Sequence, residues 1–121
     1  MKAPERSLLE PLVREVLETA HRGRGQQPHY LTAYQIVERL REPARSELIT
    51  KYGRGGKRAG SADTASSIIS QVLANELSAE VDVAYLDTRD VWFSIADELV
   101  EAGYPVVALY RLRVRRSDTM G

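Results

Sequence analysis

A basic, glycine-rich segment near the middle of the chain carries the side chains best suited to binding an anion. Four cations lie in it, Lys51, Arg54, Lys57 and Arg58, and no acidic residue interrupts them. An amphipathic stretch follows at once, and backbone amides at a helix N-terminus bind phosphate groups well. The pattern favours a nucleic-acid backbone as the anion. The alternative is a mobile loop over residues 53–60 whose charges serve only solubility.

Two other sets of polar side chains fit the same chemistry. Ser67 and Gln71 fall on the outer face of the helix expected after the basic segment, and such side chains can contact base edges. Arg111, Arg113 and Arg115 share one face of a strand by its period of two, as a row that could hold phosphates. Both sets also have a simpler explanation. Exposed helix faces are polar in any case, and charge protects edge strands from aggregation.

Catalysis and metal binding have little support in the sequence. The two histidines, His21 and His29, lack the spacing of a metal-binding motif such as H-E-x-x-H. The absence of cysteine excludes thiolate chemistry and the common structural zinc sites. We therefore expect no enzymatic activity, no metal and no cofactor.

The composition is that of a single globular domain spanning residues 1–121. The chain is 43% hydrophobic, with 17 basic and 17 acidic residues. The net charge of zero counts against a dedicated nucleic-acid-binding domain, although the basic residues are clustered. No apolar run approaches the roughly 20 residues that span a bilayer, and no signal peptide is evident. We expect a cytoplasmic protein without a membrane partner, with disordered ends at residues 1–6 and 117–121.

Helices are expected in the first two-thirds of the chain because apolar residues recur there at helical spacing. The expected ranges are 8–20, 32–41, 43–52 and 62–77. Thr32 and Gln35 form a capping-box pattern at the start of the second helix. Ser61 or Asp63 is the expected cap of the last.

Strands are expected after residue 77, where the period changes to two. Val81, Val83 and Tyr85 alternate with Asp82 and Ala84, which predicts a strand with one wet face. Residues 91–103 fit either a strand or a helix. Their β-branched and aromatic content favours a strand over 91–95 and a turn near 97–98. A further strand is expected over 106–114.

The expected core combines both kinds of element, apart from whichever strand face the sheet leaves wet. Its members are Ile36, Leu40, Ile68, Ile69, Val72, Val83, Tyr85, Leu109 and Leu112.

This order of elements resembles the winged helix-turn-helix family. The resemblance implies that helix 62–77 is the recognition helix and that residues 81–114 hold the wing. Two features depart from the family pattern, namely the intervening helix 43–52 and the long basic loop after it. The expected fold is α+β and winged-helix-like, with a small, mainly antiparallel sheet after the helices.

Two functions follow from these features. The first is a non-catalytic nucleic-acid-binding or regulatory module that uses helix 62–77 and the flanking basic residues. The alternative is a protein-interaction or accessory domain that uses the aromatic C-terminal surface and self-associates as a homodimer. The neutral net charge favours the second, whereas the clustering of the basic residues favours the first.

Overall fold

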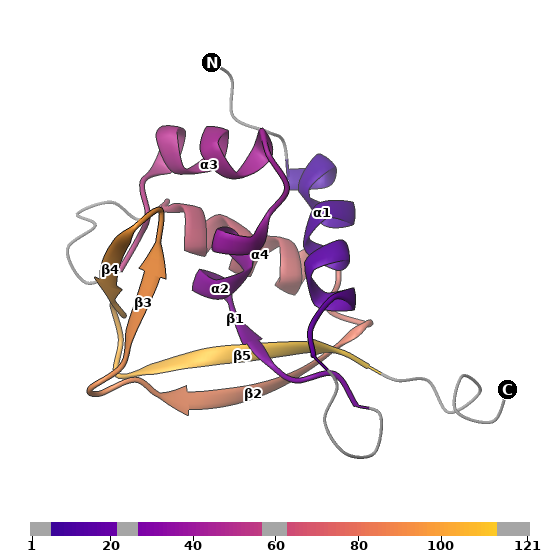
Figure 1. Cartoon of the computed structure of the whole chain (residues 1–121). Helices are drawn as coiled ribbons and strands as arrows, with labels where there is room; N and C mark the ends of the chain where they lie inside the picture. The colour runs from indigo at the N-terminus through magenta and orange to yellow at the C-terminus, as the bar shows by residue number, and fades with distance from the viewer. Residues whose placement is uncertain (1–5, 22–26, 57–62, 114–121) are drawn as a thin grey trace, which may run out of the picture.

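The computed structural model describes residues 6–21, 27–56 and 63–113 of the chain (Figure 1). In chain order, its elements are α1 (Arg6–Glu18), β1 (Leu31–Thr32), α2 (Ala33–Arg39), α3 (Ala44–Tyr52), α4 (Ala65–Asn75), β2 (Val81–Asp87), β3 (Trp92–Ile95), β4 (Glu98–Glu101) and β5 (Val106–Leu112). The predicted α+β class is confirmed, with helices in the N-terminal part and an antiparallel sheet in the C-terminal part. Arg6 belongs to α1, so the predicted disordered start is wrong at that residue. The rest of the predicted disordered ends lies outside the described residues, as do positions 57–60 of the predicted mobile loop.

Capping boxes fix where two of the helices begin. The predicted box at α2 is confirmed: the Thr32 hydroxyl accepts from the Gln35 amide, and the Gln35 side chain accepts from the Thr32 amide. At α4 the predicted cap, Ser61 or Asp63, is wrong. Thr64 is the cap, and its hydroxyl accepts from the Ser67 amide at 3.2 Å. The Ser67 hydroxyl accepts in return from the Thr64 amide at 2.7 Å. Serine can therefore fill the N3 position of the box, three residues after the cap, where Glu or Gln is usual.

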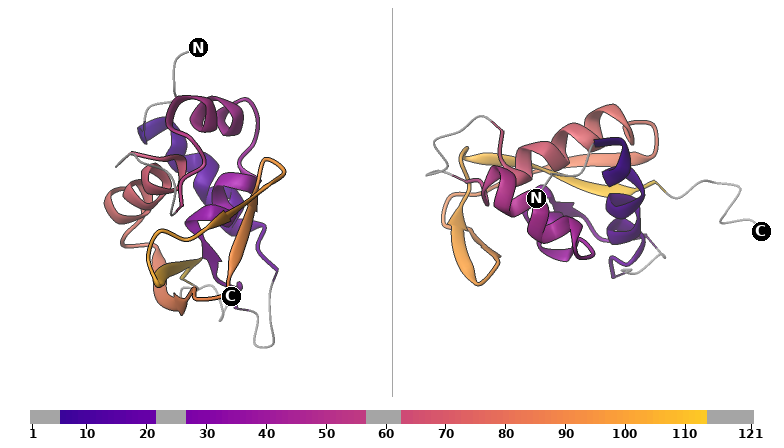
Figure 2. Two further views of the ribbon diagram at one scale, coloured as in Figure 1. Left: turned by 90° about the vertical axis from the view of Figure 1, so that its left-hand side faces the viewer. Right: turned by 90° about the horizontal axis from the view of Figure 1, so that it is seen from above.

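A three-stranded antiparallel sheet has the order β1-β5-β2. β5 pairs with β2 along the whole length of both strands, from Val81 opposite Leu112 to Asp87 opposite Val106. On the side of β5 opposite β2, β1 pairs with only two residues. The four helices lie on one side of the β5–β2 pair in Figures 1 and 2, and β2 forms an outer edge of the molecule.

The segment between β2 and β5 forms a separate hairpin, β3–β4. A strand followed by a turn was predicted here, and both are confirmed. Ala96 and Asp97 form the turn with positive φ angles of 49° and 64°, and positive φ at both central residues is what a type I′ hairpin turn requires. The Phe93 ring stacks on Tyr34 of α2, with ring centroids 4.7 Å apart. The hairpin therefore folds back against the helices at one end of the sheet (Figure 2).

The core lies mainly between the helices. Its largest fully buried side chains include Leu9, Ile36, Leu48, Ile69 and Leu73. The predicted burial of Ile36, Leu40, Ile68, Ile69 and Val72 is confirmed. Leu109 and Leu112 are only half-buried.

The strand β2 differs from the prediction. Val83 is 48% exposed and Tyr85 is 74% exposed, so their predicted burial is wrong. Of that face of the strand, only Val81 is buried. The physical reason is that β2 is an edge strand of the sheet. The helices pack mainly against β5 and β1, and on this face of β2 only Val81 reaches the core.

No helix in the described part of the chain is long and apolar enough to cross a membrane.

Candidate functional site

Five of the eight predicted nucleic-acid-binding residues lie in the described structure: Arg54, Ser67, Gln71, Arg111 and Arg113. The other three, Lys57, Arg58 and Arg115, lie outside the described residues. The positions of the five show which chemistry each side chain already performs within the fold.

Arg54 holds the β3–β4 turn in place. Its Nε donates to the Ile95 carbonyl oxygen at 3.0 Å, and its Nη2 donates to the Ala96 carbonyl oxygen at 3.3 Å. Its Nη1 lies 3.5 Å from the Glu98 carboxylate. The guanidinium is therefore engaged by backbone acceptors and partly neutralised, in contrast to the free phosphate ligand expected from the sequence.

Arg111 and Arg113 share one carboxylate, that of Asp82 on β2. Arg111 Nε lies 3.2 Å from one Asp82 oxygen, and Arg113 Nε lies 2.9 Å from the other. The Arg111 guanidinium also lies over the Tyr30 ring, 4.5 Å from its centroid. The hydrogen bond from Arg113 is the main reason that the pKa of Asp82 lies below its usual range, and Arg111 adds to the effect.

Ser67 and Gln71 lie on the half-exposed side of α4. Ser67 already serves in the capping box with Thr64. Arg54 lies at the β3–β4 turn, whereas Arg111 and Arg113 lie at the far end of β5 (Figure 1). The structure therefore does not bring the five described residues together into one anion site.

A different surface stands out in the structure, the exposed apolar side of the β2–β5 pair. Residues directly opposite each other in a sheet project from the same face. The register places Val83 opposite Tyr110 and Tyr85 opposite Ala108, with Val106 at the end of the same face. We call these five residues the ribbon face. Val83, Tyr85 and Val106 are exposed, and Ala108 and Tyr110 are half-exposed.

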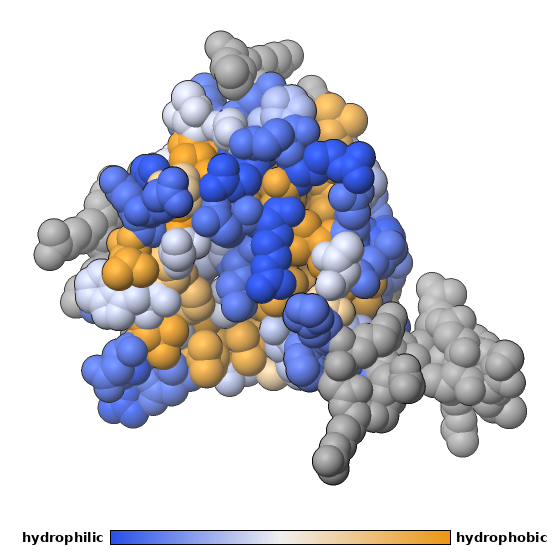
Figure 3. All heavy atoms as spheres, viewed as in Figure 1, coloured by the Kyte–Doolittle hydropathy of each residue, from blue (hydrophilic) through white to orange (hydrophobic). Residues whose placement is uncertain are grey.

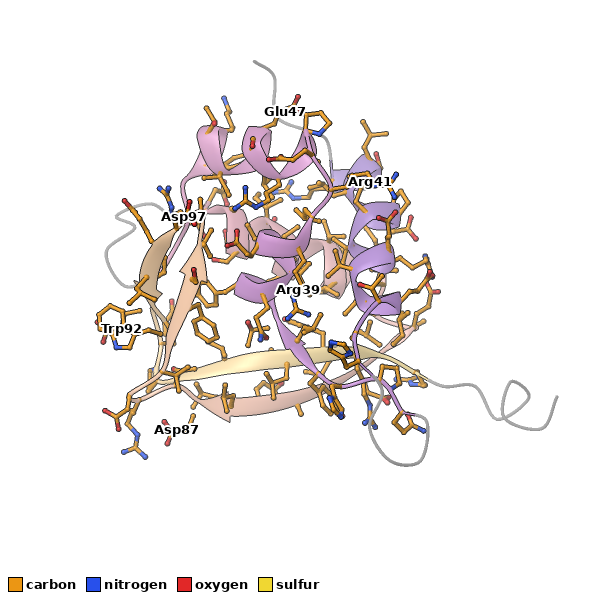
Figure 4. The ribbon with its side chains drawn as sticks, viewed as in Figure 1. Arg39, Arg41, Glu47, Asp87, Trp92 and Asp97 are labelled. Atoms are coloured by element: carbon orange, nitrogen blue, oxygen red, sulfur yellow. The ribbon has the colours of Figure 1, made fainter. Side chains whose placement is uncertain are left out.

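Further exposed apolar side chains lie on the neighbouring hairpin and the turn beside it. Trp92 and Leu99 project from the outer face of β3–β4, and Tyr104 lies in the turn before β5. Figure 4 shows the Trp92 side chain pointing outward from the β3–β4 hairpin. In Figure 3, hydrophobic residues lie over β5 and β2 between hydrophilic regions. Of the seven large apolar side chains that are exposed in the described structure, only Leu8 lies outside the segment 83–106. Such clustering of apolar surface marks interaction sites in soluble proteins.

The outer edge of β2 adds unpaired backbone groups to this surface. The Arg113 amide donates to Glu80 and the Thr88 amide donates to Pro105, both at 2.8 Å. Even-numbered residues of β2 therefore direct their N–H and C=O groups toward β5, because these groups alternate sides along a strand. The N–H and C=O groups of Val83, Tyr85 and Asp87 consequently point outward, away from β5. In the described structure, no backbone partner meets them on that edge.

Arg113 covers the beginning of the same edge. Its Nη2 donates to the Val81 carbonyl oxygen at 3.1 Å, and its Nη1 donates to the Ala79 carbonyl oxygen at 3.4 Å. A charged side chain across an edge strand blocks the addition of another strand. The open part of the edge is therefore Val83 to Asp87.

Glu38 of α2 links the hairpin to the helices. One of its carboxylate oxygens accepts from Arg45 Nε at 3.0 Å and from the Ala96 amide at 3.1 Å. Burial by itself raises the pKa of Glu38, but the bonds from Arg45 and Ala96 outweigh it, so the pKa lies below its usual range. This contact orients the hairpin and its exposed apolar side chains.

The lowered pKa values of Asp82 and Glu38 predict a loss of stability in acid. A carboxylate whose pKa is lower in the folded than in the unfolded state stabilises the folded protein. This contribution is fully present at pH values above the unfolded pKa, about 3.9–4.3. Its contribution disappears as the pH falls through the folded pKa. We therefore expect the free energy of unfolding to decrease below about pH 4. The measurement is urea denaturation at a series of pH values.

The control for this prediction is Asp82→Asn, which removes one of the two carboxylates. Its stability should fall less steeply between neutral and acid pH than that of the wild type. An equally steep fall in the variant would contradict the role of Asp82.

No group of His, Asp or Glu side chains in the described residues is placed to hold a metal ion. Comparison of the chain with protein-family models, curated proteins and solved structures found no match.

Proposed function

We propose that this protein is a protein-interaction module whose contact surface is the ribbon face together with the open edge of β2. The observation that carries the proposal is the exposure of Tyr85 and Val83 on a strand edge whose outward N–H and C=O groups, from Val83 to Asp87, have no backbone partner in the described structure. An exposed sheet edge binds another chain through main-chain hydrogen bonds, and neighbouring side chains supply the specificity.

The charges of the described residues support this proposal over anion binding. Arg54, Arg111 and Arg113 each form an ion pair within the fold. A phosphate would have to compete with carboxylates that these cations already hold. Burial of Tyr85 and Val106, by contrast, removes apolar surface from water, at about 25 cal/mol for each Å².

Affinity capture from an extract of the source cells tests the proposal. We compare the wild type with the double variant Tyr85→Ser and Val106→Ser. The matched control is Leu8→Ser, because Leu8 is an exposed apolar residue of α1 outside this surface. The proposal expects wild type and control to retain a common protein, including further copies of this chain, that the double variant loses. Identical retention by all three proteins would contradict it.

A second candidate function, nucleic-acid binding, is supported by the order of the elements. A pair of antiparallel strands and a hairpin follow α4, as the winged helix-turn-helix resemblance requires of the wing after its recognition helix. In this proposal Gln71 on the outer side of α4 contacts bases, and Lys57 and Arg58 contact phosphates.

Fluorescence anisotropy with duplex and single-stranded DNA at low salt tests this second candidate. Neutral replacements of Lys57 and Arg58 together should reduce the slope of log affinity against log salt by about 1.8 on duplex DNA, since each phosphate contact contributes about 0.9. Replacement of Gln71 should change the sequence preference and leave the slope unchanged. The absence of binding at micromolar protein would exclude this function.

A further inference from the structure

We infer that the partner of the open β2 edge is a second copy of this chain, which pairs its own β2 antiparallel across a two-fold axis at Tyr85. The inference rests on the proposed function and names the partner of the same surface. Two copies related by such an axis present the same residues to each other, so the edge has to be complementary to itself.

The backbone determines what kind of occupant fits. Along β2 in the described structure, Val83, Tyr85 and Asp87 are the residues whose N–H and C=O groups both point outward and are uncovered. Three alternate residues in extended conformation are matched by another extended strand. The stretch from Val83 to Asp87 contains no lysine, proline or glycine to prevent such pairing.

The midpoint of the uncovered residues fixes the register. With the axis at Tyr85, the two Tyr85 residues face each other, and Val83 faces Asp87 of the second copy. All three outward residues of each copy then have a hydrogen-bonding partner. The bond from Arg113 to the Val81 carbonyl oxygen stays intact, because it lies beyond the paired stretch.

The charges along β2 are compatible with this register. Asp82 faces Thr88 of the second copy and Asp87 faces Val83, so no two acids are opposed. A shift of the axis to Ala84 would place Val81 opposite Asp87, although the Val81 carbonyl oxygen is already bonded to Arg113. The hydrogen bonds of the edge therefore favour the axis at Tyr85.

The apolar side chains follow the same symmetry. In the paired arrangement, the two Tyr85 side chains lie beside each other on one face, and each Val83 lies diagonally across from Tyr85 of the other copy. The ribbon faces then form one continuous surface across a sheet of two β1-β5-β2 units. Three paired residues for each copy make a small contact compared with the roughly 800 Å² for each partner in a stable complex. We therefore expect a weak dimer that depends on concentration.

Sedimentation velocity of the full chain over a wide concentration range tests the inference. The mass should rise from 13.6 kDa toward twice that value as the concentration increases. Tyr85→Lys should weaken the association about tenfold or more, because two ammonium groups would face each other at the axis. Added salt should restore part of the association. The matched control is Leu8→Lys, which places the same charge at an exposed apolar position of α1, outside the proposed contact surface. It should change the association much less.

Hydrogen exchange of the wild type gives a second measurement that needs no variant. The amides of Val83, Tyr85 and Asp87 should become more protected as the concentration rises, whereas that of Thr88, already bonded to Pro105, should not change. A monomer at every concentration overturns the inference, as does a dimer that Leu8→Lys weakens as much as Tyr85→Lys. A monomer that still captures another protein through Tyr85 and Val106 would leave the proposed function standing without the second copy.

Discussion

Replacement of Leu9 with alanine is expected to lower the free energy of unfolding by about 2–5 kcal/mol. Leu9 lies in α1, and none of its surface is exposed. The substitution removes apolar atoms from a closely packed cluster, and the neighbours fill the resulting cavity only in part. Chemical denaturation of the wild type and the variant measures the loss.

The next residue in the chain provides the matched control. Leu8 lies on the same helix and is 62% exposed. Leu8→Ala removes the same atoms from a position already in contact with water, so its effect should stay within about 0.5 kcal/mol. Equal losses at the two positions would show that the described packing of α1 against the core is incorrect.

The helical half of the fold could be predicted from the sequence because its signals are local. The Thr32 and Gln35 pair acts over three residues, and the apolar spacing of Ile36, Ile69 and Val72 is visible within single helices. The first strand of the hairpin over 92–101 and its turn could be predicted from β-branched and aromatic content, whereas its second strand, Glu98–Glu101, was not predicted.

The burial of β2 could not be predicted in the same way. The period of two showed that Val83 and Tyr85 share a face but not which face the helices cover. Ala84 and Leu86 on the opposite side are also apolar, so the strand lacks a clear polar face. The alternation also did not show how far along β2 the core extends, and Val81 is buried on the same face on which Val83 and Tyr85 are exposed.

The arginines show a second limit of sequence reasoning. Arg111 and Arg113 were correctly placed on one face by their period, but their common partner Asp82 lies about 30 residues away in the chain. Long-range pairs of this kind depend on the strand register, which the pattern of a single strand does not determine. Arg111 and Arg113, which suggested an anion site in the sequence, form ion pairs with Asp82 in the fold.

Gly56 shows how the glycine-rich segment contributes to the fold, and Gly56→Ala is expected to be strongly destabilising. Its φ is +91°, and a Cβ atom there would lie 2.2 Å from Val100 Cγ1 and 2.5 Å from the Glu101 carbonyl oxygen. The left-handed conformation costs an alanine about 1–2 kcal/mol. Displacement of the β4 backbone adds about 1–3 kcal/mol for overpacking. Chemical denaturation measures the sum of the two costs.

Gly53 separates these two costs. Its φ is +80°, which is also unfavourable for alanine, but a Cβ atom there would meet nothing within 4 Å. Gly53→Ala should therefore show only a backbone cost, that of a positive φ with a ψ of 168°. Gly56→Ala also displaces β4, at about 1–3 kcal/mol. Only Gly56→Ala should speed hydrogen exchange in the β3–β4 hairpin, because Gly56 packs directly against β4. If exchange in the hairpin were the same in both variants, the close contact between the basic segment and β4 would be refuted. The hairpin would then be held by Arg54, Glu38 and the Tyr34–Phe93 stack without this contact.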